Sequence, residues 1–185
     1  MKSTTITTGK VRLSYFNGFV PKAAPGATTE QYGTSILIPK SDEKTVNLIK
    51  EAINDAKIAG LAKLGFTDIK KVPVTMKQPL RDGDLEKPGD PLYEGMYFLN
   101  ANNKKKPGIV DRNRQAILDP DAIWSGCYAR VNLTFYAFAV EGNKGVAAAL
   151  NHIQLIAEGE ALDGRISADE AFGDDEDFDD MDGMV

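Results

Sequence analysis

The chain has 185 residues, of which 42% are apolar and 26% charged, and its formal net charge is −5. This length and composition suit a single domain with an ordinary buried core. No run of about 20 apolar residues is present, so we expect no membrane-spanning helix. The N-terminus lacks the apolar stretch of a secretory signal, and the single cysteine, Cys127, allows no internal disulfide. Both features favour a cytoplasmic protein.

Charge is distributed unevenly along the chain. No Lys or Arg follows Arg165, whereas nine of the 27 acidic residues do. Residues 1–165 therefore hold 18 acidic against 22 basic side chains. Because the last segment is acidic and poor in apolar residues, it cannot bury enough surface to fold. We predict one domain over residues 1–165 and a disordered acidic tail over residues 166–185.

The N-terminal part predicts two strands separated by a loop. Lys10–Val20 alternates between its two sides, with Tyr15 on the same side as Leu13. Residues 21–29 are rich in Pro, Gly, Ala and Thr and are predicted to form the loop. Tyr32–Ile38 is apolar enough to be a largely buried second strand.

One amphipathic helix is predicted next. Ser41 can cap its N-terminus. Apolar side chains then recur at spacings of three and four, at Val46, Ile49, Ile53 and Ala56, which gives a single apolar stripe. We expect this helix to pack on the body of the domain.

The middle of the chain alternates between short strands and polar loops. Lys71–Met76 and Tyr93–Asn100 are predicted as strands, separated by a polar loop at Gln78–Pro91. A basic segment, Asn102–Arg114, follows and contains a Pro107-Gly108 turn.

The clearest predicted strand is Cys127–Glu141, in which one side is wholly apolar. That side is expected to face the core, which turns Tyr128, Arg130 and Tyr136 outward. A hairpin connection leads to a returning strand at Val146–Ala157. Four or more strands with one helix indicate a mainly β protein built as a small barrel.

Aromatic and basic side chains are interleaved over the second half of the domain. Aromatic rings can stack on unpaired bases, and cations beside them can bind the phosphates. The same rings could instead belong to the core, and Tyr97 and Phe98 point to opposite sides of one strand. The Lys104–Lys106 triplet could equally be a solvated turn. The predicted nucleic-acid-binding residues are Arg12, Phe16, Tyr97, Phe98, Lys104, Lys105, Lys106, Arg112, Arg114, Trp124, Tyr128, Arg130 and Tyr136.

The acidic tail fits the same interpretation. A polyanion tethered to a cationic groove competes with nucleic acid at high effective concentration. Once displaced, it could bind replication or recombination proteins, although acidic tails can also serve only solubility. The predicted partner-binding residues of the tail are Phe172, Phe178, Asp179, Asp180 and Asp182.

No catalytic constellation is recognisable. The single histidine and single cysteine allow no convincing zinc set or nucleophile pair, and no phosphate-binding glycine motif is present. We therefore expect neither enzymatic activity nor a cofactor. One alternative is a metal-dependent nuclease that uses the carboxylates of Asp82, Asp84, Glu86 and Asp90.

Several segments resemble the tailed-phage single-stranded DNA-binding protein family. They lie at residues 79–84, 97–101, 105–111, 124–130 and 145–154, and the likeness spans roughly Ser3 to Arg165. The resemblance implies an OB-type β-barrel that binds single-stranded DNA during phage DNA replication or recombination in the host cell cytoplasm. RNA binding or strand annealing uses the same physics and remains an alternative.

Overall fold

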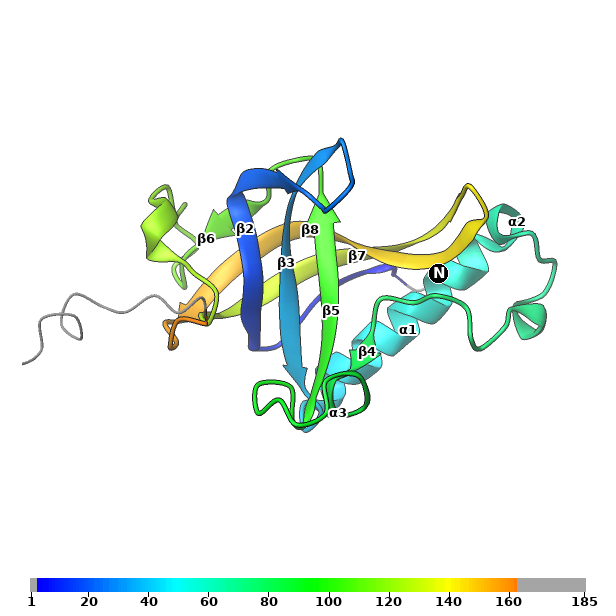
Figure 1. Ribbon diagram of the computed structural model, residues 1–185, viewed down its shortest axis with the longest axis horizontal. Helices are drawn as coiled ribbons and strands as arrows, with labels where there is room; N and C mark the ends of the chain where they lie inside the picture. Colours follow the sequence, from blue (N-terminus) through cyan, green and yellow to red (C-terminus); the bar gives the residue numbers. More distant parts are fainter. Residues whose placement is uncertain (1–2, 163–185) are drawn as a thin grey trace, which may run out of the picture.

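The computed structural model describes residues 3–162 (Figure 1). Its main elements are strands, joined by one long helix and several short helical segments. The strands are β1 (Thr5–Thr7), β2 (Val11–Ala23), β3 (Glu30–Pro39), β4 (Arg81–Asp82), β5 (Met96–Asn103), β6 (Gly108–Val110), β7 (Tyr128–Val140) and β8 (Asn143–Ala157). The helical segments are α1 (Glu43–Ala59), α2 (Leu61–Leu64), η1 (Ile69–Lys71), α3 (Gly83–Glu86) and η2 (Pro120–Ala122).

The sheet closes on itself, which confirms the predicted mainly β, OB-type barrel. Its central order is β7-β2-β3-β5-β8, and the ring closes because β7 and β8 also pair with each other. Most neighbours are antiparallel, whereas β5 and β8 are parallel. The short strands β1, β4 and β6 pair with the outer parts of this ring.

The barrel interior holds the main apolar core. The predicted apolar side of the long strand is buried from Cys127 to Ala137, as expected. The predicted helix is also confirmed, and Val46, Ile49, Ile53 and Ala56 all pack into this core. Its cap is Asp42 rather than Ser41, and the Asp42 carboxylate accepts a hydrogen bond from the Thr45 amide at 3.2 Å. Two shorter helices, α2 and α3, were not predicted.

The predicted strand at Lys71–Met76 is wrong. The 3₁₀ turn η1 begins at Ile69 and is capped by the Asp68 side chain, which accepts a hydrogen bond from Lys70. Pro73 cannot donate to a strand ladder. Val74 would lie on the same face as the buried Val72 in a strand, but it is 94% exposed. The alternation of apolar residues at 71–76 therefore belongs to a turn, and these residues pair with no neighbouring strand.

Smaller differences concern where strands begin and end. β2 continues to Ala23 through the predicted loop, and β5 begins at Met96, after Tyr93. The loop predicted at Gln78–Pro91 contains β4 and α3, because the Asp82 side chain caps α3. Within the described residues, no helix has the length and apolar character needed to cross a membrane.

Candidate nucleic-acid interface

The outer face of β2, β3 and β5 forms the floor of a groove. Strand pairing places Ser14, Ser35 and Asn100 in one outward row and aligns Asn17, Gly33 and Asn102 in the next. Glycine fits best at position 33, because a Cβ atom would lie 2.9 Å from the Ala101 carbonyl oxygen and would also meet the Asn102 side chain. Since the neighbouring positions Ile36 and Leu99 fill the core, the same strands carry the barrel interior and a polar outer floor.

Tyr15 stands above this floor on a β-bulge. The pairing of β2 with β3 shifts register between Ser14 and Asn17, and Tyr15 has φ +46°. This conformation is costly for a residue with a side chain. It turns the ring outward, so that Tyr15 is 78% exposed instead of sharing a face with Leu13. The predicted alternation fails here because the bulge inserts residues into the strand.

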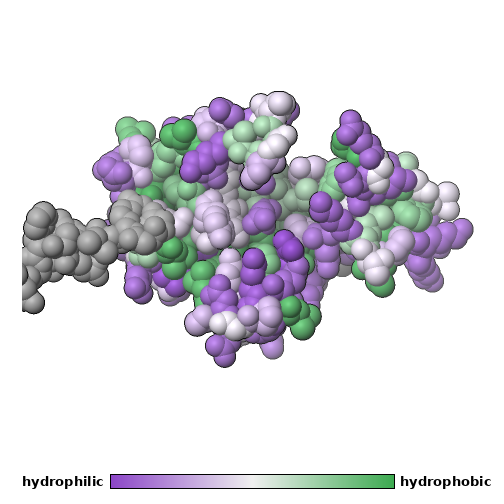
Figure 2. Space-filling view, viewed as in Figure 1, coloured by the Kyte–Doolittle hydropathy of each residue, from purple (hydrophilic) through white to green (hydrophobic). Residues whose placement is uncertain are grey.

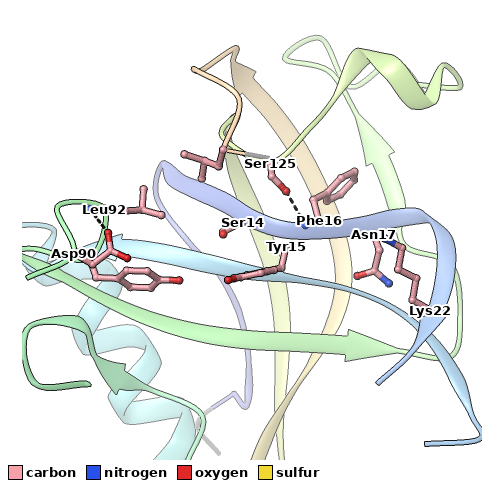
Figure 3. A pocket seen from close by; sticks show the side chains of 10 residues that line it. Ser14, Tyr15, Phe16, Asn17, Lys22, Asp90, Leu92 and Ser125 are labelled. Atoms are coloured by element: carbon pink, nitrogen blue, oxygen red, sulfur yellow. Dashed lines mark hydrogen bonds between the residues drawn. The ribbon is translucent and has the colours of Figure 1, made fainter. Parts of the chain in front are cut away.

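The groove has two adjoining hollows, of about 530 and 490 Å³. Tyr15, Asn17 and Tyr93 line both of them. Figure 3 shows Tyr15 pointing across the first hollow toward the segment that carries Asp90 and Leu92. The ring of Tyr15 therefore lies between the two hollows, which together form one continuous groove.

One wall of the groove is the segment from β4 to the start of β5. Tyr93 packs edge-on against Phe98 with ring centroids 5.1 Å apart, and both cover Leu37 in a second small apolar cluster. Burial, followed by the nearby Tyr15 and Asp90, raises the pKa of Tyr93. Cations lie over these rings at the groove: the Arg81 guanidinium is 5.3 Å from the Phe98 centroid. The Lys87 ammonium is 5.9 Å from the Tyr93 centroid.

This wall is fastened to the barrel by Lys40. Its ammonium lies 2.7 Å from a carboxylate oxygen of Asp82 and 2.7 Å from one of Asp84. Hydrogen bonds from Lys40 lower the pKa of both carboxyl groups, and the same bonds raise the pKa of Lys40. Asp84 also accepts a hydrogen bond from the Gly95 amide. These contacts therefore bind the start of the segment, at Asp82 and Asp84, both to Lys40 and to its end at Gly95.

The same contacts bear on the nuclease alternative. Asp82 and Asp84 are neutralised by Lys40, and Glu86 forms an ion pair of 2.6 Å with Arg81. Carboxylates bound to cations of the chain lack the free charge that a divalent metal needs. No group of three potential ligands is gathered for a metal among residues 3–162.

A third hollow adjoins the groove beyond Asn17. Phe16 and Phe19 pack edge-on at 6.0 Å, and Trp124 lines the same space. The ammonium of Lys106 lies 5.6 Å from the Phe19 ring centroid. The structure therefore brings together three predicted residues, Phe16, Trp124 and Lys106, beside the groove.

Other predicted residues are placed elsewhere or are buried. Tyr97 points away from the groove and contacts Lys40 and Lys50, with ammonium-to-ring distances of 5.1 and 5.3 Å. Phe98 faces the groove side but is only 4% exposed. Tyr136 lies on the outer side of β7 and does not line the groove. Exposed positions in loops or on the outer side of β7 are occupied by Lys104, Lys105, Arg112, Arg114 and Arg130.

Three of the predicted residues, Arg12, Trp124 and Tyr128, lie at the segment that precedes the acidic tail. Arg12 donates hydrogen bonds to the carbonyls of Gly126 and Glu160, at 3.1 and 3.0 Å, and its guanidinium lies over the Tyr128 ring. The Trp124 indole donates to the Gly159 carbonyl at 2.9 Å. Leu162, the last described residue, lines the groove beside Tyr15. The predicted tail residues themselves lie outside the described part of the chain.

Sequence reasoning missed part of the groove. Its missed lining residues are Tyr15, Asn17, Arg81, Lys87, Asn100 and Asn102. Asn100 and Asn102 alternate with the core residues Leu99 and Ala101, so strand periodicity alone could have marked them as outward. The bulge at Tyr15 left no such signal.

The closed barrel and the groove on its outer face, which carries an exposed aromatic ring, define a small OB-type barrel. The comparisons with known proteins then establish the family. Residues 4–182 match the family described as Enterobacter phage Enc34, ssDNA-binding protein. The chain belongs to this family, which confirms the resemblance seen in the sequence. The family is one of binding proteins rather than enzymes.

Individual relatives agree with this assignment. The chain is 33% identical over 165 residues to putative protein p50 of Acyrthosiphon pisum secondary endosymbiont phage 1, and the match covers 86% of each chain. The single-stranded DNA-binding protein of bacteriophage Enc34, solved in complex with ssDNA, superposes with a TM-score of 0.75 at 24% identity, over 87% of this chain and 90% of the other. Bacteriophage T7 gp2.5, a single-stranded DNA-binding protein, has a TM-score of 0.63 at 14% identity, over 90% of this chain and 99% of its own. These two structures show a shared fold.

Proposed function

We propose that this protein binds single-stranded DNA, with little sequence preference, in the groove on the outer face of β2, β3 and β5. The observation that carries the proposal is the exposed Tyr15 ring, held out over a polar floor in a member of this phage family. A ring in this position can stack on an unpaired base, which a duplex would not offer. The second and third strands of an OB barrel, here β3 and β5, are a common oligonucleotide-binding face.

The surroundings of Tyr15 suit the other parts of a nucleotide. Lys22 in one hollow, with Arg81 and Lys87 in the other, can bind phosphates. The carboxamides of Asn100 and Asn102 point out of the floor and can donate to or accept from base edges. Phe16, Trp124 and Lys106 would continue the path at the adjoining hollow. The groove thus offers an aromatic ring for stacking, cations for phosphates and carboxamides for hydrogen bonds along one path.

A matched pair of tyrosine variants tests the proposal. Stacking on one ring contributes roughly 1–3 kcal/mol, so Tyr15→Ala should weaken oligo-dT binding by about 5- to 150-fold. Tyr15→Phe should keep most of the affinity. Tyr136→Ala removes a ring that is also exposed but lies away from the groove, and should change little. Fluorescence anisotropy with labelled oligo-dT measures all three; equal losses for Tyr15→Ala and Tyr136→Ala would contradict the groove assignment.

We further propose that the acidic tail competes with DNA for this groove. The support is geometric: the chain leaves the described region at Leu162, which already lines the groove. A tail that begins there is held at high effective concentration beside the cations. In phage DNA replication or recombination within the host cytoplasm, DNA would displace the tail and free its acidic and aromatic residues for protein partners.

RNA differs from DNA by its 2′-hydroxyl group, so a preference for DNA requires that the groove bind this group poorly. Competition between matched dT and rU oligomers against labelled dT decides between a DNA-binding protein and the RNA-binding alternative. Binding of rU at least as tight as that of dT would overturn the preference for DNA.

A further inference from the structure

One of the two basic regions of the folded body lies far from the groove. We define the basic lobe as residues 57–77 together with the β7–β8 turn, residues 139–145. It contains six lysines against Asp68 and Glu141, whereas the other described residues hold 14 Lys and Arg against 15 Asp and Glu. The lysines of the lobe are Lys57, Lys63, Lys70, Lys71, Lys77 and Lys144. The lobe therefore carries a net charge of +4, as does the basic segment at residues 102–114, which has five Lys and Arg against Asp111.

The lobe is one connected surface. The Lys144 ammonium donates to the Leu64 carbonyl at 3.1 Å, which joins the β7–β8 turn to α2. The Val146 amide donates to the Lys77 carbonyl at 3.0 Å, which joins β8 to the end of the η1 loop. Within residues 3–162 the ion pairs involve only Lys40 and Arg81 as cations, so no lobe lysine is neutralised in this way.

The apolar side chains of the lobe are also uncovered. Ile58 is 48% exposed, Val140 62% and Val74 94%. Figure 2 shows hydrophobic and hydrophilic residues intermixed at this end of the molecule. Aliphatic side chains offer no aromatic face for base stacking, but they can contact apolar side chains of a peptide. Ammonium groups beside aliphatic patches match an acidic peptide with interspersed apolar residues.

The chain itself contains such a peptide in the segment after Arg165, which has nine acids, no Lys or Arg, and two phenylalanines, Phe172 and Phe178. Figure 1 places the C-terminal end of the described chain and the basic lobe at opposite ends of the long axis. The chain beyond Leu162 can extend to at most roughly 80 Å. We propose that the acidic tail of one molecule docks on the basic lobe of a second copy.

Such a contact joins unlike surfaces. Two copies can exchange tails and close as a dimer, or the contacts can repeat head to tail along a chain of copies. Copies bound side by side on one strand would be linked by it, because DNA in the groove would increase the fraction of tails that are free to reach a neighbour. This cooperative consequence rests on the proposed function, but the contact between copies does not.

Two full-length variants test the contact by complementation. Lys63→Glu/Lys71→Glu reverses charge on two exposed lobe lysines, and Asp175→Asn/Asp177→Asn/Asp179→Asn/Asp180→Asn reduces the tail charge. By sedimentation velocity at low salt, wild type should self-associate and each variant should do so roughly tenfold or more weakly. An equal mixture, which supplies one intact tail and one intact lobe, should recover dimers without longer chains. Lys44→Glu/Lys50→Glu, on exposed lysines of α1, is the matched control and should behave as wild type.

Binding to oligo-dT separates this inference from the proposed function. On an oligomer that holds one copy, both variants should bind DNA; on one that holds two copies, only wild type should favour the second. Self-association that survives lobe reversal but is abolished by oligo-dT would overturn the inference, because the tail would then occupy the neighbour's groove. Weaker binding of the lobe variant to the one-copy oligomer would also overturn it, because the lobe would then bind nucleic acid. Failure of wild type to bind any oligomer would instead refute the proposed function.

Discussion

Tyr15 shows how one strained residue can shape an exposed surface, here the proposed binding groove. The bulge holds it at φ +46°, and the ring is 78% exposed between two hollows. A left-handed conformation costs a residue with a Cβ atom about 1 kcal/mol or more. We interpret this cost as the consequence of turning an aromatic ring out of a strand whose inner side fills the core.

Two truncations at this residue separate strain from binding. Tyr15→Ala and Tyr15→Gly both remove the ring, but only glycine adopts φ near +46° without a penalty. We expect Tyr15→Gly to be more stable than Tyr15→Ala by about 1 kcal/mol, and both to bind oligo-dT equally weakly. Urea unfolding monitored by Trp124 fluorescence measures the difference. Greater stability of the alanine variant would mean that Tyr15 is not strained.

Ion pairs hold the segment from β4 to the start of β5 in position against the barrel. Lys40, directly after β3, contacts Asp82 in β4 and Asp84 in α3. The segment carries Tyr93, Arg81 and Lys87 over the floor of the groove. A wall fastened by ion pairs should respond to pH, and the bound oligonucleotide should respond with it.

Replacing Lys40 by methionine tests this dependence. The lowered pKa of Asp82 and Asp84 means that their contribution to stability is present above the ordinary value near 4. It is lost as pH falls through the lowered values. Lys40→Met should therefore be less stable than wild type at pH 7 and bind oligo-dT less tightly there. The difference in stability should disappear as pH falls below about 4 and the two carboxyl groups become protonated. Urea unfolding at each pH measures this, with Lys44→Met as the control; a gap that persists in acid would contradict the assigned ion pairs.

At the scale of the whole molecule, charge is separated by position. The groove holds few cations, the basic lobe lies far from it, and the described chain ends at Leu162 beside the groove. Binding of single-stranded DNA with about five phosphate contacts should weaken with salt at a log–log slope of roughly −3 to −4. This dependence comes from counterion release and is independent of base sequence.

Deleting residues 166–185 tests the competition by the tail. At low salt the shortened chain should bind oligo-dT roughly tenfold more tightly than the full chain, because an intramolecular competitor is removed. The advantage should shrink as salt rises, since screening weakens the attraction between tail and groove. Titrations of both chains at several salt concentrations measure the effect. Equal affinities at low salt would refute the competition.

The local pattern of apolar residues was sufficient to predict much of the barrel and its helix. The apolar side of Cys127–Ala137 and the helix stripe from Val46 to Ala56 are strictly periodic, and both proved to be core. Periodicity is a local property of the backbone, so it survives in the sequence. The uneven charge and the ordered family motifs were likewise visible without coordinates.

The binding surface was decided by tertiary structure. Trp124 and Arg12 carry the residue types of a DNA contact, yet both donate hydrogen bonds to the segment before the tail. Tyr15 reaches the surface where β2 shifts register against β3. Arg81 and Lys87 reach the groove through a distant segment that pairs with β5 and is bound by Lys40. Such placements depend on strand register and on contacts between residues far apart in the chain, and no local pattern encodes them.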